Sequence, residues 1–135
     1  ALALAVEAAQ TAVATCTANG YKTTATVVDS AGVPVVILSG DGAPERTQAV
    51  GLSKTTTTIK YKVPSGDIAD KVKTDATLDA EIKADPKIGT ARRGALPIKV
   101  GGEIIGAMSV SGAPGGDKDE VCVQAGLDKI ASRLK

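Results

Sequence analysis

The last third of the chain, residues 95–134, constrains the fold more than any other stretch. ALPIKV is followed by Gly101-Gly102 and then by EIIGAMSV, a pattern that predicts two strands joined by a tight turn. The loop SGAPGGD comes next, and the segment after it has the spacing of an amphipathic helix. The apolar stripe of this helix consists of Val123, Leu127, Ile130 and Leu134. A strand–turn–strand–loop–helix unit is therefore expected here.

Three acidic residues stand at the start of this last helix: Asp117, Asp119 and Glu120. We expect Asp117 to be the N-cap and Glu120 to complete a capping box. A cluster of carboxylates is alternatively a metal site, although acids at a helix N-terminus mainly stabilise the helix itself. We therefore interpret these three acids as helix-capping groups and expect no bound metal.

The first forty residues indicate a helix followed by a hairpin. Residues 2–18 are rich in alanine, and Asn19-Gly20 supplies the left-handed residue that ends a helix. Residues 21–29 and 33–39 are rich in Thr, Val and Ile and are expected to be two strands with a turn between them. Pro34 suits an edge strand, because proline cannot donate to a ladder of hydrogen bonds.

A second long helix is expected from Glu45 onward, although it contains four consecutive threonines, residues 55–58. Such residues lose side-chain freedom in a helix, so tertiary contacts must hold this one. Their hydroxyls are expected to be solvated or to bond back to the preceding turn, and lining a polar surface is the alternative. Shorter helical segments are expected after Pro64, capped by Ser65 or Asp67, and at residues 77–83.

The order of these elements determines the fold class. Two hairpins separated by helices, with a long helix at each end, indicate one α+β domain over residues 1–135. We expect a central antiparallel sheet from the two hairpins with flanking helices. Strands and helices do not alternate singly, which disfavours a doubly wound nucleotide-binding fold.

The composition excludes several functions. The chain has no His, Phe or Trp, two Tyr, and a net charge of +1. The chain has no excess of basic residues to bind phosphates and almost no aromatic residues to stack on bases, so no nucleic-acid partner is expected. No apolar run reaches the ~20 residues of a membrane span. A core of small side chains instead favours burial of further surface between subunits, and a homo-oligomer is expected.

The two cysteines, Cys16 and Cys122, bear on the compartment. In an exported protein an even pair suggests a disulfide between the terminal helices, whereas in the cytosol both would be buried small hydrophobes. The opening ALALA would suit a chain that follows a cleaved signal peptide, or a trimmed one. The expectation is a bridged, periplasmic or secreted protein, with a cytoplasmic location as the alternative.

Two groups of residues are candidates for anion binding. Ser111, Gly112, Gly115 and Gly116 precede a helix N-terminus, where free backbone N–H groups favour an anion, or they form only a tight strand-to-helix connection. Arg92 and Arg93 are suited to clamp carboxylates, or are solvated surface residues.

Two stretches resemble the GlcG/HbpS-like haem-binding family, which is sometimes labelled haem-degrading and also occurs as a domain attached to corrinoid adenosyltransferases. They are VVDSAGVPVVILSGDGAP at residues 27–44 and LPIKVGGEIIGAMSVSGAPGGDKDEVCVQAGL at residues 96–127. Lys54 and Thr57 are similar to the K-A-x-T pattern of the family, so Lys54 is a further candidate for ligand binding. The resemblance covers nearly the whole chain.

The resemblance implies a profilin-like fold, a homo-oligomer, and binding of haem or a related tetrapyrrole in some members. Thr56 stands where the family usually has an aromatic residue, and residues 90–94 (TARRG) replace a glycine-rich segment. Because the chain has no His, ligation of haem iron by His is impossible. Iron would need Cys, Met, Tyr or a hydroxyl as its axial ligand, or weak packing alone.

The sequence therefore favours an oligomeric ligand-binding protein over an enzyme. One alternative is an enzyme acting on a small carboxylate metabolite, using Lys54, the arginines and the glycine loop. This hypothesis lacks a recognisable nucleophile–base pair, and no catalytic residue is assigned. A structural or partner-binding oligomer without a small ligand is the other alternative.

Overall fold

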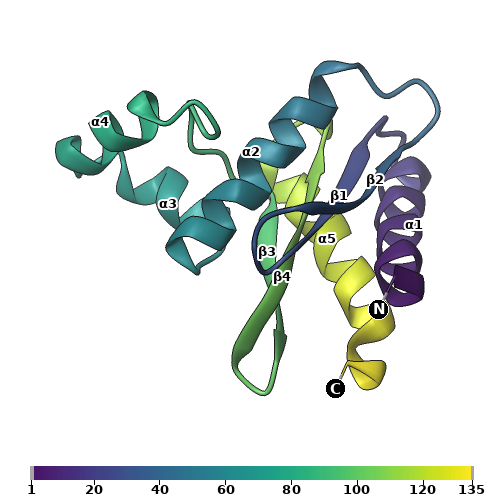
Figure 1. Cartoon of the computed structure of the whole chain (residues 1–135). Helices are drawn as coiled ribbons and strands as arrows, with labels where there is room; N and C mark the ends of the chain where they lie inside the picture. Colours follow the sequence, from purple (N-terminus) through teal and green to yellow (C-terminus); the bar gives the residue numbers. More distant parts are fainter. Residues whose placement is uncertain (1, 135) are drawn as a thin grey trace.

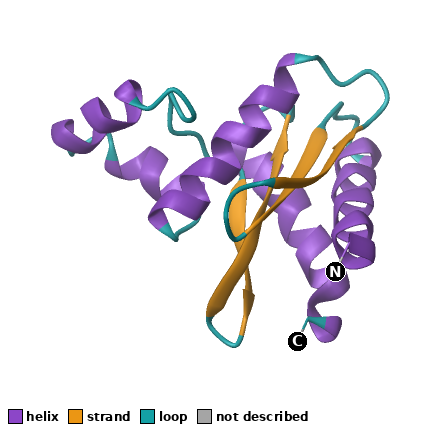
Figure 2. Cartoon of the chain, viewed as in Figure 1, coloured by secondary structure: helices purple, strands orange, loops and turns teal. Residues whose placement is uncertain are grey.

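One four-stranded antiparallel sheet organises the computed structural model, which describes residues 2–134 (Figures 1 and 2). Its strand order is β2-β1-β4-β3, so the two hairpins join through their inner strands, β1 and β4. The edge strand β2 carries Pro34 at its start, as predicted. The strands are β1 (Thr24–Asp29), β2 (Pro34–Ser39), β3 (Ala95–Val100) and β4 (Glu103–Ser111).

Helices cover both faces of the sheet. Two of them, α1 and α5, lie side by side on one face, and α2 crosses the other face (Figure 1). The α+β class with a central antiparallel sheet is confirmed. The helices are α1 (Leu2–Ala18), α2 (Arg46–Tyr61), α3 (Ser65–Lys71), α4 (Ala76–Ala84) and α5 (Gly116–Ile130), with a 3₁₀ turn at Ala131–Arg133.

The α3–α4 arm, residues 65–84, projects away from the sheet (Figure 1). A second apolar cluster joins Ile68 and Ile82 of the arm to Ile88, which follows it, and Tyr61 of α2 packs against this cluster. Two polar contacts attach it to the end of α2: Tyr61 Oη donates to Glu81 at 2.7 Å, and Lys60 Nζ donates to Asp85 at 2.9 Å. None of the helices described combines the length and apolar character that a membrane crossing requires.

The two faces of the sheet differ in chemistry, because side chains alternate along each strand. In β1, Ala25 and Val27 pack into the apolar layer with α1 and α5, whereas Thr24 and Thr26 meet α2. Gly126 lets α1 and α5 approach closely: a Cβ there would lie 2.5 Å from the carbonyl oxygen of Ala8. The apolar layer is built from small residues, as the composition indicated.

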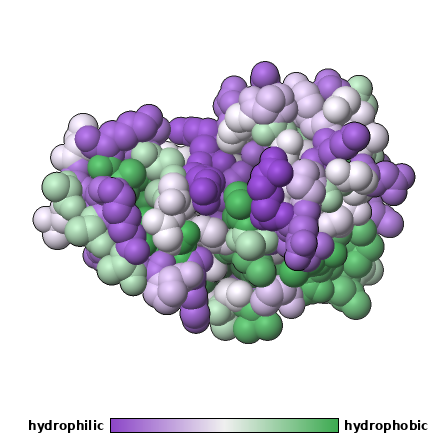
Figure 3. All heavy atoms as spheres, turned by 90° about the horizontal axis from the view of Figure 1, so that it is seen from above, coloured by the Kyte–Doolittle hydropathy of each residue, from purple (hydrophilic) through white to green (hydrophobic). Residues whose placement is uncertain are grey.

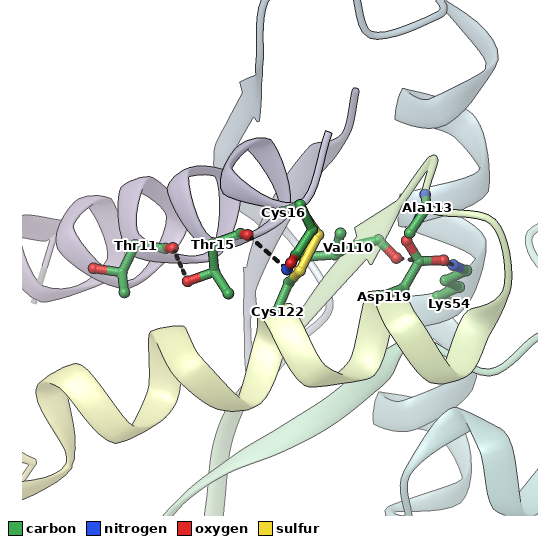
Figure 4. Close-up of a disulfide and its surroundings, with 9 residues drawn as sticks. Thr11, Thr15, Cys16, Lys54, Val110, Ala113, Asp119 and Cys122 are labelled. Carbon is green, nitrogen blue, oxygen red and sulfur yellow. Dashed lines mark hydrogen bonds and ion pairs between the residues drawn. A yellow bond between two sulfur atoms is a disulfide. The ribbon is translucent and has the colours of Figure 1, made fainter. Parts of the chain in front are cut away.

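A disulfide between Cys16 and Cys122 joins α1 to α5 across this apolar layer (Figure 4). The two Cα atoms are 5.8 Å apart, and the residues are separated by 106 positions in the sequence. Cross-linking residues so distant in sequence restricts the unfolded chain strongly, which is the main route by which a disulfide stabilises a fold.

The predicted N-caps of α3 and α5 are wrong, whereas α1 ends before Gly20 at φ 82°, as predicted. The chain enters α5 through Gly115 at φ 127°, which has no side chain to cap the helix, and Asp117 already lies in the first turn. The side chain of Glu120 is directed to Arg93, at 3.3 Å, instead of completing a capping box. At α3 the N-cap is Pro64, and Ser65 Oγ instead accepts a hydrogen bond from the backbone N–H of Ala95.

Candidate functional site

The face of α2 that packs on the sheet is polar rather than apolar. Its buried residues recur at helical spacing and include Thr47, Gly51, Lys54, Thr55 and Thr58. The hydroxyl of Thr55 donates to the carbonyl of Leu52 at 3.0 Å, within its own helix, as predicted for a back-bonded threonine. Solvation, the other expectation, is wrong for Thr55, Thr57 and Thr58, which are fully buried, whereas Thr56 is only partly buried.

A chain of hydrogen bonds connects the start of α2 to the edge of the sheet. Thr47 Oγ1 donates to the carbonyl of Pro44 at 2.5 Å, which uses its only hydrogen. Thr24 must therefore donate to Thr47 at 2.7 Å, and Ser39 must donate to Thr24 at 2.8 Å. Gln48 Nε2 completes the series by donating to Ser39 at 3.3 Å. The first bond therefore fixes the direction of both hydroxyl–hydroxyl bonds.

Two serines of β4 donate hydrogen bonds to backbone carbonyls of α2. Ser109 Oγ donates to the carbonyl of Gly51 at 2.8 Å, and Ser111 Oγ donates to the carbonyl of Thr47. Gly51 makes this approach possible, because a Cβ there would lie only 2.9 Å from Thr26 Oγ1. These bonds fix the height of α2 above the end of β4, and so they place Lys54.

Lys54 and Asp119 form a buried ion pair that joins α2 to α5 (Figure 4). Lys54 Nζ lies 2.8 Å from Asp119 Oδ2 and also donates to the carbonyl of Val110 at 2.8 Å. Asp119 Oδ1 accepts from the N–H of Ala113 at 2.9 Å, and each side chain of the pair is 4% exposed. A Cβ at Gly94 would lie 2.6 Å from Lys54 Nζ, so a glycine is needed there.

Burial shifts both members of this pair towards their neutral forms. It lowers the pKa of Lys54 below its usual value; the nearby Asp119 charge opposes this shift, and Arg92 adds to it. Burial likewise raises the pKa of Asp119, against the attraction of Lys54. The two pKa values therefore lie closer together than in water, which makes proton transfer within the pair less costly.

A cavity of about 550 Å³ opens beside the ion pair, a volume typical of small-molecule sites. It lies between α2, α3, the segment before β3 and the loop before α5. Five cationic side chains line it, against one carboxylate, that of Asp119. The seven residues predicted as candidate ligand-binding residues all lie on its wall: Lys54, Arg92, Arg93, Ser111, Gly112, Gly115 and Gly116.

The arginines of the cavity have different roles. Arg93 is held by Asp70 at 2.9 Å and Glu120 at 3.3 Å, so it braces α3 against α5. Arg92 and Arg46 are exposed and form no ion pair within residues 2–134. Sequence reasoning missed Arg46 and Lys73, because only the packing of α2 and α3 brings them to this wall.

The donor set of the cavity suits carboxylates but not iron. The usual axial ligands of haem are His, Cys, Met and Tyr, and none of them lines this wall. Met108 is fully buried in the apolar layer, both cysteines are in the disulfide, and Tyr61 is bonded to Glu81. No group of three or more potential metal-ligating residues (His, Cys, Asp or Glu) occurs within residues 2–134.

The fold and the site together define a small α+β protein with a cationic cavity between a polar helix and a glycine-rich loop. The chain belongs to the family described as haem degrading protein HbpS-like, which it matches over residues 1–128. The family resemblance seen in the sequence is confirmed. No relative was found among curated proteins.

Solved structures of the same fold cover nearly the whole chain. A double glutamate-to-aspartate mutant of HbpS from Streptomyces reticuli is 28% identical, with a TM-score of 0.86 over 96% of this chain and 86% of that one. The Klebsiella pneumoniae protein ORFY is 23% identical, with a TM-score of 0.89 over 98% and 90%. PduOC, solved as a complex with heme, is 18% identical, with a TM-score of 0.85 over 95% and 92%.

Proposed function

We propose that this protein binds a ligand that carries carboxylate groups in the cavity beside Lys54. The observation that carries the proposal is the charge of the cavity wall, with five cationic side chains and one carboxylate. Arg46 and Arg92 have no protein partner within the described residues, and a guanidinium recognises a carboxylate through two parallel hydrogen bonds. The glycine loop leaves backbone N–H groups at the start of α5 on the same wall.

Haem is the ligand that the family description and the PduOC complex suggest. Its two propionates match the cations of the cavity, whereas its iron has no usual axial ligand there. We therefore propose that haem is held by its propionates and by packing. A porphyrin without iron is then expected to bind about as tightly as hemin.

Titration of the protein with hemin and with protoporphyrin IX, followed by absorbance and fluorescence, tests this proposal. Saturable binding of both with similar Kd supports it, and absence of saturable binding of either would overturn it. Arg92→Met should weaken both by roughly tenfold or more, since a hydrogen bond to a charged group contributes about 1.5–3 kcal/mol. Lys99→Met, which removes an exposed cation of β3 outside the cavity, is the matched control. Much tighter binding of hemin than of protoporphyrin would contradict unligated iron.

We further propose that the protein is a homo-oligomer that associates through β2. Val33, Val35 and Ile37 are 56%, 42% and 41% exposed, and they lie on or beside an edge strand with no charged residue. Seen from above, hydrophobic residues gather on the side opposite the α3–α4 arm (Figure 3). Light scattering after size-exclusion chromatography should give a multiple of 13.5 kDa, and Ile37→Lys should reduce it. A monomeric parent protein would refute the proposal.

The disulfide supports a further proposal, that the protein works in an oxidising compartment such as the periplasm or outside the cell. Alkylation of thiols in intact cells before lysis, followed by mass measurement, tests it. No label on Cys16 or Cys122 is expected without reductant, and two labels with it. Two labelled thiols without reductant would favour the cytoplasm.

A further inference from the structure

Lys54 is the one buried amine on the wall of the cavity, within the residues that the structure describes. The other amine on that wall, Lys73, is 75% exposed. The chain has no His, and both cysteines are in the disulfide. Lys54 uses two donor positions, on Val110 and Asp119, and an ammonium group has three. One position on its nitrogen is therefore left without a protein partner, in a residue that lines the cavity.

We propose that Lys54 forms an imine with a small 2-oxo acid bound in this cavity. The inference rests on the proposed function, because the same cations would hold the carboxylate of the acid. Arg92 is near enough to Lys54 for its charge to act on the amine. Both residues line the same cavity, so a 2-oxo acid that directs its carbonyl to Lys54 has a guanidinium on the same wall for its carboxylate. Burial of the amine favours its neutral form, which is the nucleophile in imine formation.

Asp119 supplies the proton transfers. Its carboxylate, 2.8 Å away, takes one proton from the ammonium group of Lys54. The nitrogen lone pair then forms a bond to the carbonyl carbon, and the resulting oxygen takes a proton from nitrogen to give a carbinolamine. The C–O bond breaks as Asp119 returns its proton to the departing hydroxyl, which leaves as water. The products are a protonated imine, one water molecule and the Asp119 carboxylate, so charge and atoms balance.

The lowered pKa of Lys54 and the raised pKa of Asp119 both favour the first step, since each shift makes the neutral pair more accessible. The geometry also explains why Asp119 does not serve as a helix cap. It faces the amine with one oxygen and the N–H of Ala113 with the other.

Trapping with pyruvate and sodium cyanoborohydride tests the inference. The reductant converts an imine to a stable secondary amine, and intact mass with peptide mapping locates it. One adduct per chain on Lys54 is expected, with none in Lys54→Arg, an unchanged yield in Lys99→Arg and a roughly tenfold lower yield in Arg92→Met. Should Lys54→Arg fail to fold, the mapped position in the parent protein still decides. No adduct, or one spread over exposed lysines, would overturn the inference.

Lactate, which has the carboxylate but no carbonyl, separates this inference from the proposed function. Calorimetric binding of lactate and pyruvate, with an adduct from pyruvate alone, supports both. If both acids bind and neither is trapped, the imine is refuted and carboxylate binding stands. If neither acid binds nor is trapped, and hemin and protoporphyrin IX also fail to bind, the proposed function fails as well.

Discussion

Helices pack on the two faces of the sheet through different kinds of interaction. Towards α1 and α5, small apolar side chains interlock and a disulfide joins the helices. Towards α2, hydroxyls, helix carbonyls and one ion pair replace the apolar contacts. Apolar contacts have no preferred direction, whereas hydrogen bonds fix direction and distance. The polar face is the one that borders the cavity, so directional bonding occurs where Lys54 must be held in place.

The largest expected effect comes from breaking the ion pair of the polar face. Lys54→Met leaves Asp119 buried without its partner and should lower the free energy of unfolding by roughly 3–5 kcal/mol. The usual pKa of Asp119 is 3.8, and burial raises it in the fold, so the deficit should grow as the pH rises and Asp119 ionises. Urea unfolding at several pH values measures this. The double variant Lys54→Met/Asp119→Leu should regain most of the stability, and a double variant as unstable as the single one would contradict the explanation.

The corresponding change on the apolar face is removal of the disulfide. Replacing Cys16 and Cys122 together by Ala should lower the free energy of unfolding by roughly 2–5 kcal/mol. Ligand binding should persist below the lowered Tm, because the cavity wall contains neither cysteine. Thermal unfolding with and without reductant provides the check, and reductant should leave the double variant unaffected. Loss of binding in the folded variant would show that the two faces are coupled.

Two glycines in the middle of helices compare the faces directly. Gly126→Ala places a Cβ against the backbone of α1, 2.5 Å from an oxygen that cannot rotate away, and should cost about 1–3 kcal/mol. In Gly51→Ala the new Cβ meets side-chain hydroxyls, the nearest at 2.9 Å, which can move. Helix propensity improves equally in both variants, so the difference reports packing. Chemical denaturation of the pair should rank Gly126→Ala as the less stable, and the reverse order would refute this interpretation.

A matched pair of threonines tests whether each hydroxyl of the polar face contributes. Thr24→Val removes two hydrogen bonds and should cost about 1–2 kcal/mol. Thr26→Val removes a buried hydroxyl that has no partner within the described residues, and should raise stability by up to about 1 kcal/mol. Both substitutions change the side-chain shape in the same way. Opposite effects on stability would therefore report the contribution of the hydrogen bonds of Thr24. Equal losses in the two variants would contradict the assignment.

The smallest effect is expected at the surface of the apolar side, where Arg133 donates to Glu7 and so joins the 3₁₀ turn after α5 to α1. This hydrogen bond holds the pKa of Glu7 below its usual value of 4.5. The stability that this ion pair contributes to the fold is therefore fully present above pH 4.5. It is lost as the pH falls through the lower pKa that Glu7 has in the folded state. Glu7→Gln should lower Tm slightly at neutral pH and not at strongly acidic pH. A difference that persists in acid would rule out the ion pair as its cause.

The fold could be predicted from the sequence because its signals are local. Gly101-Gly102 marks a hairpin turn by itself, and both residues adopt positive φ. The ion pair could not be predicted, because Lys54 and Asp119 are 65 positions apart and only the height of α2 above β4 brings them together. Asp119 was interpreted as a capping acid for the same reason. Its position near the start of the helix suits a cap, but the chain enters α5 through Gly115, at positive φ, and Asp119 lies in the first turn.

The disulfide has a topological consequence. The bond between Cys16 and Cys122 closes a covalent ring that contains the whole sheet, α2 and the α3–α4 arm. A protease cut in the exposed arm would therefore yield a two-chain molecule whose pieces stay linked until a reductant is added. Continuity of the backbone and integrity of the molecule are separate properties in this protein, and the arm is the place where the first could be lost while the second is kept.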